Sequence, residues 1–389
     1  MTTLSRRDFG KLAGASTAAA LLPQTASAQG AKLPNPLAWT AYDVGSGGYN
    51  QSVAIGKALK DTYGVDLRVL PGKNDISRQI PLREKQVDFS ATGIGATYFA
   101  QEGVFEFGTK QWGPQAVRTL VACNADSTLS VLVAKDSGVK TLADLKGKRV
   151  AWTVGSPSLN ENIGAMLHFA GLSWSDVKRV EFPGWGQGMD GVINNLADAA
   201  FAQTTSGKAY QLESSPRGIH WPPLPHGDTE GWKRLRQKAP FFIPAKGIEG
   251  ASLSKDKPHE GAAYPYPILT AYADADESKV YAMTKAMIEL FPKYKDTVPG
   301  INGWALDRQK LDWALPLHPG AIRYFKEIGK WNEALQKHTD SLVERQKVLK
   351  AAWTEVMGKN IADDTAFQKA WMDARAAKLE AAKMDAVYR

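Results

Sequence analysis

The sequence predicts an α/β protein made of two lobes. Strand-like and helix-like segments alternate from Leu37 onward, and a strand, a glycine-rich turn and a helix follow one another twice, about 110 residues apart. Alternating strands and helices are typical of a parallel or mixed sheet with helices on both faces. Since each repeat opens an α/β region of its own, we expect two lobes that close on a ligand held between them.

The first glycine-rich turn follows an extended apolar run, 37–42, and precedes apolar residues at helical spacing in 51–60. Glycines permit a sharp turn, and the N–H groups of a first helical turn carry partial positive charge. This arrangement suits a carboxylate or phosphate. The spacing matches neither G-x-G-x-x-G nor a G-K-[ST] ending, which disfavours a nucleotide. We predict that the turn binds an anion through Gly45, Ser46, Gly47, Gly48, Tyr49 and Asn50.

Residues 1–28 are predicted to be an export signal of the twin-arginine type. Arg6 and Arg7 precede a small-residue, apolar segment at 12–22, and an A-x-A motif predicts cleavage after about Ala28. No other run reaches the roughly 18 apolar residues of a membrane span. We therefore expect a periplasmic protein that is exported after it has folded.

Composition narrows the class of partner. The single cysteine, Cys123, cannot form an internal disulfide, so stability must come from a sizeable core. The formal net charge is +8, and the export signal holds three basic residues and one acidic residue, which leaves +6 for the remainder. The basic residues are spread along the chain, so we expect no nucleic-acid partner, whereas a small anionic ligand suits this balance.

The rest of the first region reads as a strand at 65–69, a helix at 74–84 with an asparagine cap, and a strand at 87–92. Ligands of such sheets lie beyond the carboxyl ends of the strands, which adds Thr92 and Gly93 to the candidate site. Lys73, Arg78 and Arg118 could pair with a carboxylate, but their spacing does not place them in the cleft, and Arg78 is expected on the solvated helix surface.

The second region begins after strands at 119–124 and 129–134. A short helix from 142 leads into a strand at 150–154, a second polar turn and a helix through 163–170. Proline removes one N–H donor, yet the remaining groups still form a polar surface. The predicted contacts from this turn are Gly155, Ser156, Pro157, Ser158 and Asn160.

Two further segments face the expected cleft. The strand at 199–202 ends in Gln203 and Thr204, and a loop at 184–188 could lay the indole of Trp185 over the ligand, with buried packing of that indole as the alternative.

Four segments together resemble one family, the TAXI family of TRAP-transporter solute receptors. They are Gly45–Gly48, Leu142–Val150 ahead of Gly155–Pro157, Asp198–Phe201, and Leu317–Tyr324. The resemblance covers about Leu37 to Gly329. It implies a two-lobed, periplasmic-binding-protein-like fold of type II that captures a small organic anion or an amino acid, often a carboxylate such as glutamate or 2-oxoglutarate. It also implies delivery to TRAP-type integral membrane subunits driven by an ion gradient.

Under this resemblance the first lobe comprises 31–125 and 264–329, and the second lobe comprises 126–263. The chain departs from the family at Tyr49-Asn50-Gln51, where a tyrosine pair is usual, and at Ser158-Leu159-Asn160, where a Gly-Ser-Gly run is usual. Carboxylate capture is still expected after both departures, but they leave open what binds the rest of the ligand.

Neither a metal nor a cofactor is predicted. His220, His226 and His259 lie in a stretch rich in proline and aromatics, 216–267, which reads as loops and short strands, and their spacing fits no metal motif. A helix is expected at 278–291, and His318 is expected to be a structural residue at the start of the next helix.

Residues 330–389 are predicted to form a C-terminal helical extension. Apolar residues recur every seven positions from Ile328 to Val356, Gly358 ends this helix, and a second helix begins near Asp363. His338 and Arg345 interrupt the apolar seam, which disfavours a sustained coiled coil. The pair either packs over the lobes or forms a homodimer.

The leading hypothesis is a solute receptor without catalysis, because no nucleophile or metal set is assembled in the sequence. Two alternatives remain open. One is an exported enzyme whose glycine-rich turn holds a phosphate-bearing cofactor, and the other is a receptor of similar fold that serves an ABC transporter or a sensor.

Overall fold

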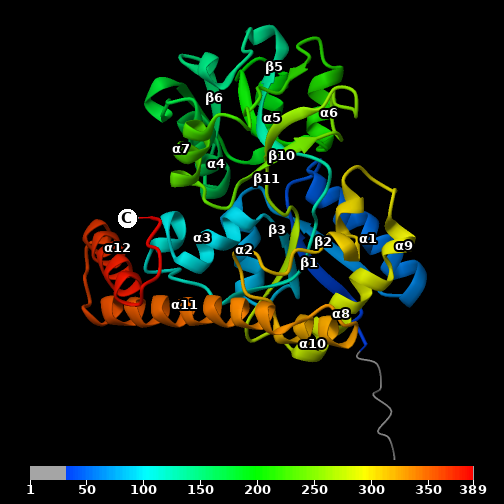
Figure 1. The fold of residues 1–389 in the computed structure, drawn as a ribbon, viewed down its shortest axis with the longest axis vertical. Helices are drawn as coiled ribbons and strands as arrows, with labels where there is room; N and C mark the ends of the chain where they lie inside the picture. Colours follow the sequence, from blue (N-terminus) through cyan, green and yellow to red (C-terminus); the bar gives the residue numbers. More distant parts are fainter. Residues whose placement is uncertain (1–31, 389) are drawn as a thin grey trace, which may run out of the picture.

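The computed structural model describes residues 32–388, so the predicted export signal lies outside the described residues. The described chain folds into two lobes stacked on each other, each built around a five-stranded sheet (Figure 1). Among these residues, no helix combines the length and apolar character needed to cross a membrane.

The sheet of the first lobe has the strand order β2-β1-β3-β12-β4. β1 pairs in parallel with β2 and β3, whereas β12 runs antiparallel to β3 and β4. The strands are β1 (Leu37–Ala41), β2 (Leu67–Pro71), β3 (Phe89–Thr92), β4 (Val117–Ala122) and β12 (Ile268–Tyr272).

The sheet of the second lobe has the matching order β7-β6-β8-β5-β9, with β5 antiparallel to both its neighbours. Its strands are β5 (Leu129–Ala134), β6 (Arg149–Thr153), β7 (Lys178–Phe182), β8 (Ala199–Gln203) and β9 (Ile219–His220), and a hairpin of β10 (Ile243–Gly247) and β11 (His259–Ala263) completes the strands. The chain passes between the two sheets twice, after β4 and before β12. This is the two-lobed α/β architecture of type II periplasmic binding proteins, and the predicted fold class is confirmed.

Twelve α-helices surround the sheets of the described chain. They are α1 (Gly47–Tyr63), α2 (Asp75–Arg83), α3 (Ile94–Glu102), α4 (Pro157–Phe169), α5 (Trp185–Ile193), α6 (Gly207–Ser214), α7 (Thr229–Lys238), α8 (Glu277–Glu289), α9 (Phe291–Tyr294), α10 (Pro319–Glu327), α11 (Glu333–Gly358) and α12 (Asp364–Ala381).

The capping residues read from the sequence set several helix ends as expected. Asn74 caps α2 through a capping box with Ser77, Asp363 caps α12, and α11 ends at Gly358. Two predictions were wrong. The segment at 184–188 is the first turn of α5 rather than a loop, and 216–267 contains the ten-residue helix α7 besides loops and short strands.

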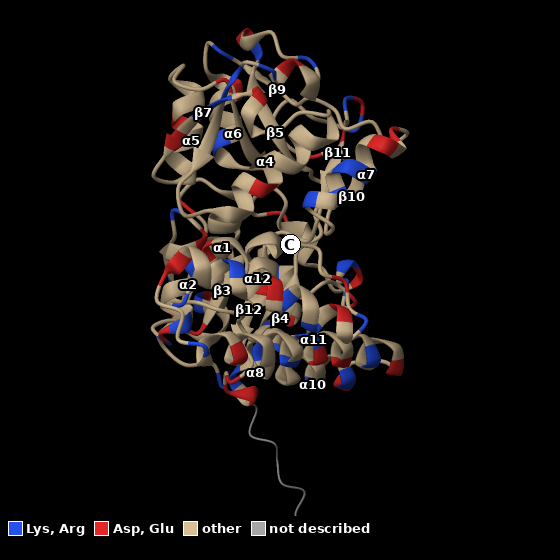
Figure 2. Cartoon of the chain, turned by 90° about the vertical axis from the view of Figure 1, so that its left-hand side faces the viewer, with Lys and Arg blue, Asp and Glu red and all other residues tan. Residues whose placement is uncertain are grey.

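The C-terminal extension packs on the first lobe. α11 runs along the face of that lobe remote from the second one, and α12 turns back beside α3 (Figure 1). A small core holds the two helices together through Leu349, Ala352, Val356, Phe367, Trp371 and Leu379. The end of the chain lies at the level where the lobes meet (Figure 2), and Figure 2 also shows basic and acidic residues mixed over both lobes.

A buried ion cluster joins this extension to α3. Glu102 is fully buried, and both of its oxygens accept hydrogen bonds of 2.7 Å from Arg345 on α11, while Arg375 on α12 pairs with the same carboxylate. Burial alone would raise the pKa of Glu102, but the two guanidinium groups lower it below its ordinary value. The extension therefore completes the first lobe electrostatically.

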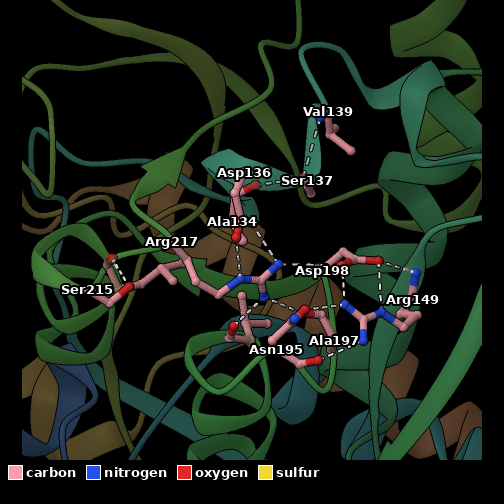
Figure 3. Close-up of polar contacts among 12 residues, drawn as sticks. Ala134, Asp136, Ser137, Val139, Arg149, Asn195, Ala197, Asp198, Ser215 and Arg217 are labelled. Atoms are coloured by element: carbon pink, nitrogen blue, oxygen red, sulfur yellow. Dashed lines mark hydrogen bonds and ion pairs between the residues drawn. The ribbon is translucent and has the colours of Figure 1, made fainter.

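A second ion cluster lies at the N-terminal ends of β6 and β8 (Figure 3). Asp198, just before β8, pairs with Arg149 at 2.7 Å and with Arg217 at 3.7 Å, and Arg217 also pairs with Asp136. These contacts tie β6, β8 and the turn before β9 together. Asp198, part of the segment that carries the family resemblance, thus has a structural role.

Candidate ligand-binding cleft

The candidate cleft begins at the N-terminus of α1. Ser46 caps this helix, and its Oγ accepts a hydrogen bond of 3.1 Å from the N–H of Tyr49, while the N–H of Gly48 bonds the hydroxyl of Tyr266. Among the described residues, none accepts a hydrogen bond from the N–H of Gly47. The first turn of this 17-residue helix therefore leaves the N–H donor of Gly47, with its partial positive charge, without a partner in the described chain.

The second lobe presents two unpaired polar atoms at this point. Gln203 at the end of β8 is only 4% exposed, and its Oε1 has no partner within the described chain, while its Nε2 donates to Ser127 Oγ at 3.0 Å. Thr205, at 3% exposed, also has an unpaired hydroxyl. A Cβ on Gly47 would lie 2.3 Å from Gln203 Oε1 and 3.9 Å from Thr205 Oγ1, so both atoms face the start of α1.

A small cavity between the lobes adjoins these groups. Its volume is about 20 Å³, enough for about one water molecule, so a larger solute requires the lobes to separate. Its lining is mainly aromatic and aliphatic and contains no charged side chain. The lining residues are Tyr42, Ser46, Gly47, Leu129, Leu159, Trp185, Phe201, Ala202, Gln203, Ser206, Tyr264 and Tyr266.

The tyrosines of this lining remain neutral. Burial is the largest influence on Tyr42, Tyr264 and Tyr266 and raises the pKa of each hydroxyl above its ordinary value. Tyr42 and Tyr266 pack edge to face, with ring centroids 5.1 Å apart. The cavity therefore has rigid aromatic walls whose polar groups are hydroxyls.

Oxygen atoms of the first lobe accept hydrogen bonds from backbone N–H groups at the helix N-termini of the second lobe. The carboxylate of Asp75 accepts a hydrogen bond of 2.8 Å from the N–H of Ser158 at the start of α4. The carboxylate of Asp43 accepts a hydrogen bond of 3.1 Å from the backbone N–H of Gly186 at the start of α5. The carbonyl of Gly45 accepts one of 3.4 Å from the backbone N–H of Lys208 at the start of α6. Oxygens of the protein itself thus occupy positions where an external anion would bind.

Asp75 belongs to a fully buried ion pair. Arg78, one turn later on α2, pairs with its other carboxylate oxygen and lies over the Tyr42 ring at 3.6 Å. Arg78 is 1% exposed, so the prediction of a solvated surface arginine was wrong. It also donates to the carbonyl of Gly72 at 3.3 Å. The positive charge nearest the cleft is therefore already neutralised.

The structure brings four of the predicted site residues to the cavity wall: Ser46, Gly47, Trp185 and Gln203. Trp185 contributes its ring face, since its indole N–H donates to the carbonyl of Phe201 at 2.9 Å. Gly45 and Gly48 border the same helix start, and Thr92 and Gly93 hydrogen-bond the hydroxyl of Tyr42.

Other predicted residues have protein partners. Asn160 bonds both backbone groups of Thr153 at 2.9 Å, and Thr204 is bonded to Thr128 and Glu249. Gly155 and Ser158 contact the start of α2 in the first lobe, through Asn74, Ile76 and Asp75. Ser156 and Pro157 lie between them, and the Ser156 hydroxyl is buried and unpaired. Tyr49 and Asn50 lie outside the cavity wall.

Reasoning from the sequence missed the aromatic walls and the internal carboxylates. Tyr264 and Tyr266 lie in the Tyr-Pro-Tyr-Pro segment at the second passage between lobes, and Tyr42 ends the first apolar run. Their clustering before β12 was a usable signal, because crossover segments of two-lobed proteins border the cleft. Asp75 gave no such signal, since it reads as an ordinary acidic residue in a first helical turn.

Comparison with known proteins gives a family and several similar folds. The model of the NMT1-like family matches residues 45–329. An alkanesulfonate-binding protein from Xanthomonas axonopodis pv. citri, bound to MOPS, is 16% identical with a TM-score of 0.44 and matches over 79% of this chain and 84% of its own. An ancestral arginine-binding protein bound to arginine is 14% identical, with a TM-score of 0.42 over 70% of this chain and 97% of that one. An ABC-transporter periplasmic binding protein from Brucella ovis, with glutathione bound, is 10% identical, with a TM-score of 0.41 over 65% and 67%.

Proposed function

Because the chain belongs to the NMT1-like family and has the fold of periplasmic solute-binding proteins, we propose that it is a periplasmic receptor for a small organic anion or amino acid. The solute is held between the lobes, at the start of α1, and is released unchanged. The observation that carries this proposal is the free N–H of Gly47 opposite the unpaired, buried polar atoms of Gln203 and Thr205. Unpaired buried polar groups are costly, and a bound solute would satisfy them.

We extend the proposal to delivery. The resemblance of the sequence to TAXI receptors supports transfer of the solute to TRAP-type membrane subunits, and the predicted export signal supports a periplasmic location. The second candidate is a receptor for an ABC transporter, which the same fold supports. Solute uptake by cells that carry the native transporter distinguishes them: an ionophore stops a TRAP-type transporter, whereas depletion of ATP at a maintained ion gradient stops an ABC transporter.

The receptor function is tested by native mass spectrometry of protein purified from its own host, followed by release and identification of the bound molecule. A small organic acid or amino acid that exchanges and stays unchanged on incubation supports a receptor. A retained nucleotide or flavin, or conversion of the ligand to a product, would instead support the exported enzyme.

The position of the site is tested by Gly47→Ala. The added methyl would displace Gln203 Oε1 from its position beside α1 and disturb the bond of the same amide to Ser127. We expect solute affinity to fall about tenfold or more, since a hydrogen bond lost at a buried site costs on the order of 1–3 kcal/mol. Calorimetric titration measures this.

Gly358→Ala is the matched control, because a Cβ there meets open space at the end of α11. Unchanged solute affinity in Gly47→Ala, with both variants folded, would move the site away from α1.

A further inference from the structure

We propose, on the basis of the receptor function above, that the solute is a monocarboxylate with an N–H or O–H donor on the adjacent carbon and an uncharged apolar body. This describes a 2-amino or 2-hydroxy acid with an aliphatic or aromatic side chain. The proposal excludes dicarboxylates such as glutamate and 2-oxoglutarate, which the family resemblance suggests.

The helix starts around the cleft determine where an anionic group of the solute can bind. Each helix N-terminus that the second lobe turns toward the first is paired with an oxygen of the protein: α4 with Asp75, α5 with Asp43 and α6 with the carbonyl of Gly45. At α3, the hydroxyl of Tyr42 takes the N–H of Gly93. The helix starts of the second lobe thus already hold oxygens of the protein, and we place the single carboxylate at α1, where the N–H of Gly47 has no acceptor among the described residues and the unpaired Thr205 hydroxyl lies close by.

A second carboxylate on the solute would have no cation to pair with in the cavity lining. The lining of the cavity has no lysine, arginine or histidine, and the closest guanidinium, that of Arg78, is held by Asp75. Asp43 and Asp75 place two carboxylates at the seam between the lobes. A second anionic group on the solute would lose its hydration without gaining a cation and would meet these like charges, which is strongly unfavourable in a buried site.

The unpaired polar atoms beside Gly47 suit a solute with a hydrogen-bond donor next to its carboxylate. The Thr205 hydroxyl can donate to the carboxylate bound at Gly47, whereas Gln203 Oε1 can only accept. Both atoms face the same point of α1. An acceptor placed directly beside an anion requires a donor from the solute within one carbon of the carboxylate, which an ammonium or hydroxyl group at position 2 provides.

Aromatic and aliphatic side chains surround the space that remains for the body of the solute. Beyond the polar groups the cavity is walled by the rings of Tyr42, Trp185, Phe201, Tyr264 and Tyr266 and by two leucines. The Tyr42, Tyr266 and Trp185 polar atoms are already bonded within the protein. When the lobes separate to admit a solute, these walls offer apolar and aromatic contacts, and they match an aliphatic or aromatic side chain.

The test is isothermal titration calorimetry of the full-length mature protein with five compounds: leucine, 2-hydroxy-4-methylpentanoate, 4-methylpentanoate, glutamate and 2-oxoglutarate. We expect the first two to bind about tenfold or more tightly than 4-methylpentanoate, which lacks the donor, because that compound leaves Gln203 Oε1 unpaired. We expect no measurable binding of the two dicarboxylates.

Binding of a dicarboxylate as tightly as leucine overturns the proposed solute class and leaves the receptor function standing. Failure of all five compounds also overturns the solute class, and the mass spectrometry of the native ligand then decides the receptor function separately.

Gln203→Met tests whether Gln203 recognises the donor group of the solute. The readout is the ratio of affinities for solutes with and without that donor, which misfolding does not mimic. Loss of the amide should remove the preference for leucine and 2-hydroxy-4-methylpentanoate over 4-methylpentanoate, so that their affinities converge. Gln237→Met, an exposed glutamine on α7, is the matched control and should keep the preference. A preference that persists unchanged in Gln203→Met contradicts the assignment of Gln203.

Discussion

Asp75 is the residue whose role differs most from its appearance in the sequence. It caps the start of α4 in the other lobe and neutralises Arg78 on its own helix. A protein carboxylate thus occupies the second of the two predicted anion-binding turns. The closed arrangement of the lobes is thereby stabilised by a contact that resembles a bound ligand.

We expect Asp75→Ala to be strongly destabilised and to be rescued by small carboxylates. The substitution leaves Arg78 buried without a counter-charge, and breaking a buried ion pair in this way costs on the order of 3–5 kcal/mol. Acetate can enter the space and restore the pair. Thermal unfolding with and without sodium acetate measures the rescue, and an acetate effect no larger than in the wild type would contradict this role.

Buried His259 should make the protein less stable in mild acid. Burial is the main cause that lowers its pKa to about 4, and its ring lies between Thr128 Oγ1 at 2.8 Å and the carbonyl of Pro222 at 3.1 Å. The folded-state pKa of His259 lies below the unfolded value of about 6.5. The contribution of the neutral, buried ring to the free energy of unfolding is therefore complete above pH ~6.5. It is lost as the pH falls from about 6.5 to about 4.

Chemical unfolding measured across that pH range tests this expectation. The wild type should lose about 3 kcal/mol more than His259→Gln between the two ends of the range. Parallel pH profiles of the two proteins would show that His259 does not cause the loss.

At the scale of secondary-structure elements, sequence reasoning worked where a local signal exists. The caps Asn74 and Asp363 and the end at Gly358 predicted the limits of their helices. It failed where contacts with distant residues determine the environment of a side chain. Arg78 was expected to be solvated, but Asp75 and the Tyr42 ring bury it. Trp185 was expected in a loop, but it begins α5, which packs on β6. The glycine-rich turn before α1 was predictable, but the aromatic walls come from four separate segments, at residues 42, 185, 201 and 264–266.

The seven-residue apolar repeat predicted the length of α11 but not the face that it buries. Arg345 and Gln346, which interrupt the repeat, are buried against the first lobe, where Arg345 binds Glu102 and Gln346 bonds Gln101 at 2.7 Å. The polar positions of this helix therefore specify where it docks.

We expect Glu102→Gln to release the C-terminal extension. The substitution leaves Arg345 and Arg375 without a carboxylate in a buried site, at a cost on the order of 3–5 kcal/mol. Limited proteolysis followed by mass spectrometry should show cleavage near 359–363, between α11 and α12, at protease levels that leave the wild type intact. Glu355→Gln, which removes an exposed carboxylate from α11, is the control, and equal resistance of Glu102→Gln and Glu355→Gln would contradict the prediction.

At the scale of the whole molecule, the extension binds the lobe of its own chain. The tail after α12 continues this contact, since the hydroxyl of Tyr388 donates to the carbonyl of Lys238 in the second lobe at 3.1 Å and its ring packs on Phe99 and Phe105. The end of the chain therefore touches both lobes. Opening of the cleft must accommodate or break this contact.

We expect the protein to be a monomer. The apolar faces of α11 and α12 are already buried against each other and against α3, so a homodimer through these helices would require the extension to leave its lobe. Native mass spectrometry at micromolar concentration measures the mass of the intact particle. A dimer that persists on dilution would restore the dimerisation hypothesis.

The chain order of the two lobes also has a consequence for biosynthesis. The sheet of the second lobe is built from one continuous stretch of chain, β5 to β9. The sheet of the first lobe requires the later strand β12, and the buried carboxylate of Glu102 in that lobe requires Arg375. Chains emerge from the ribosome N-terminus first. The second lobe can therefore fold before β12, Arg345 and Arg375, which complete the first lobe, have been synthesised. We expect a polypeptide cut short before residue 375 to keep an incompletely neutralised Glu102 and to be cleaved by proteases more readily than the finished molecule.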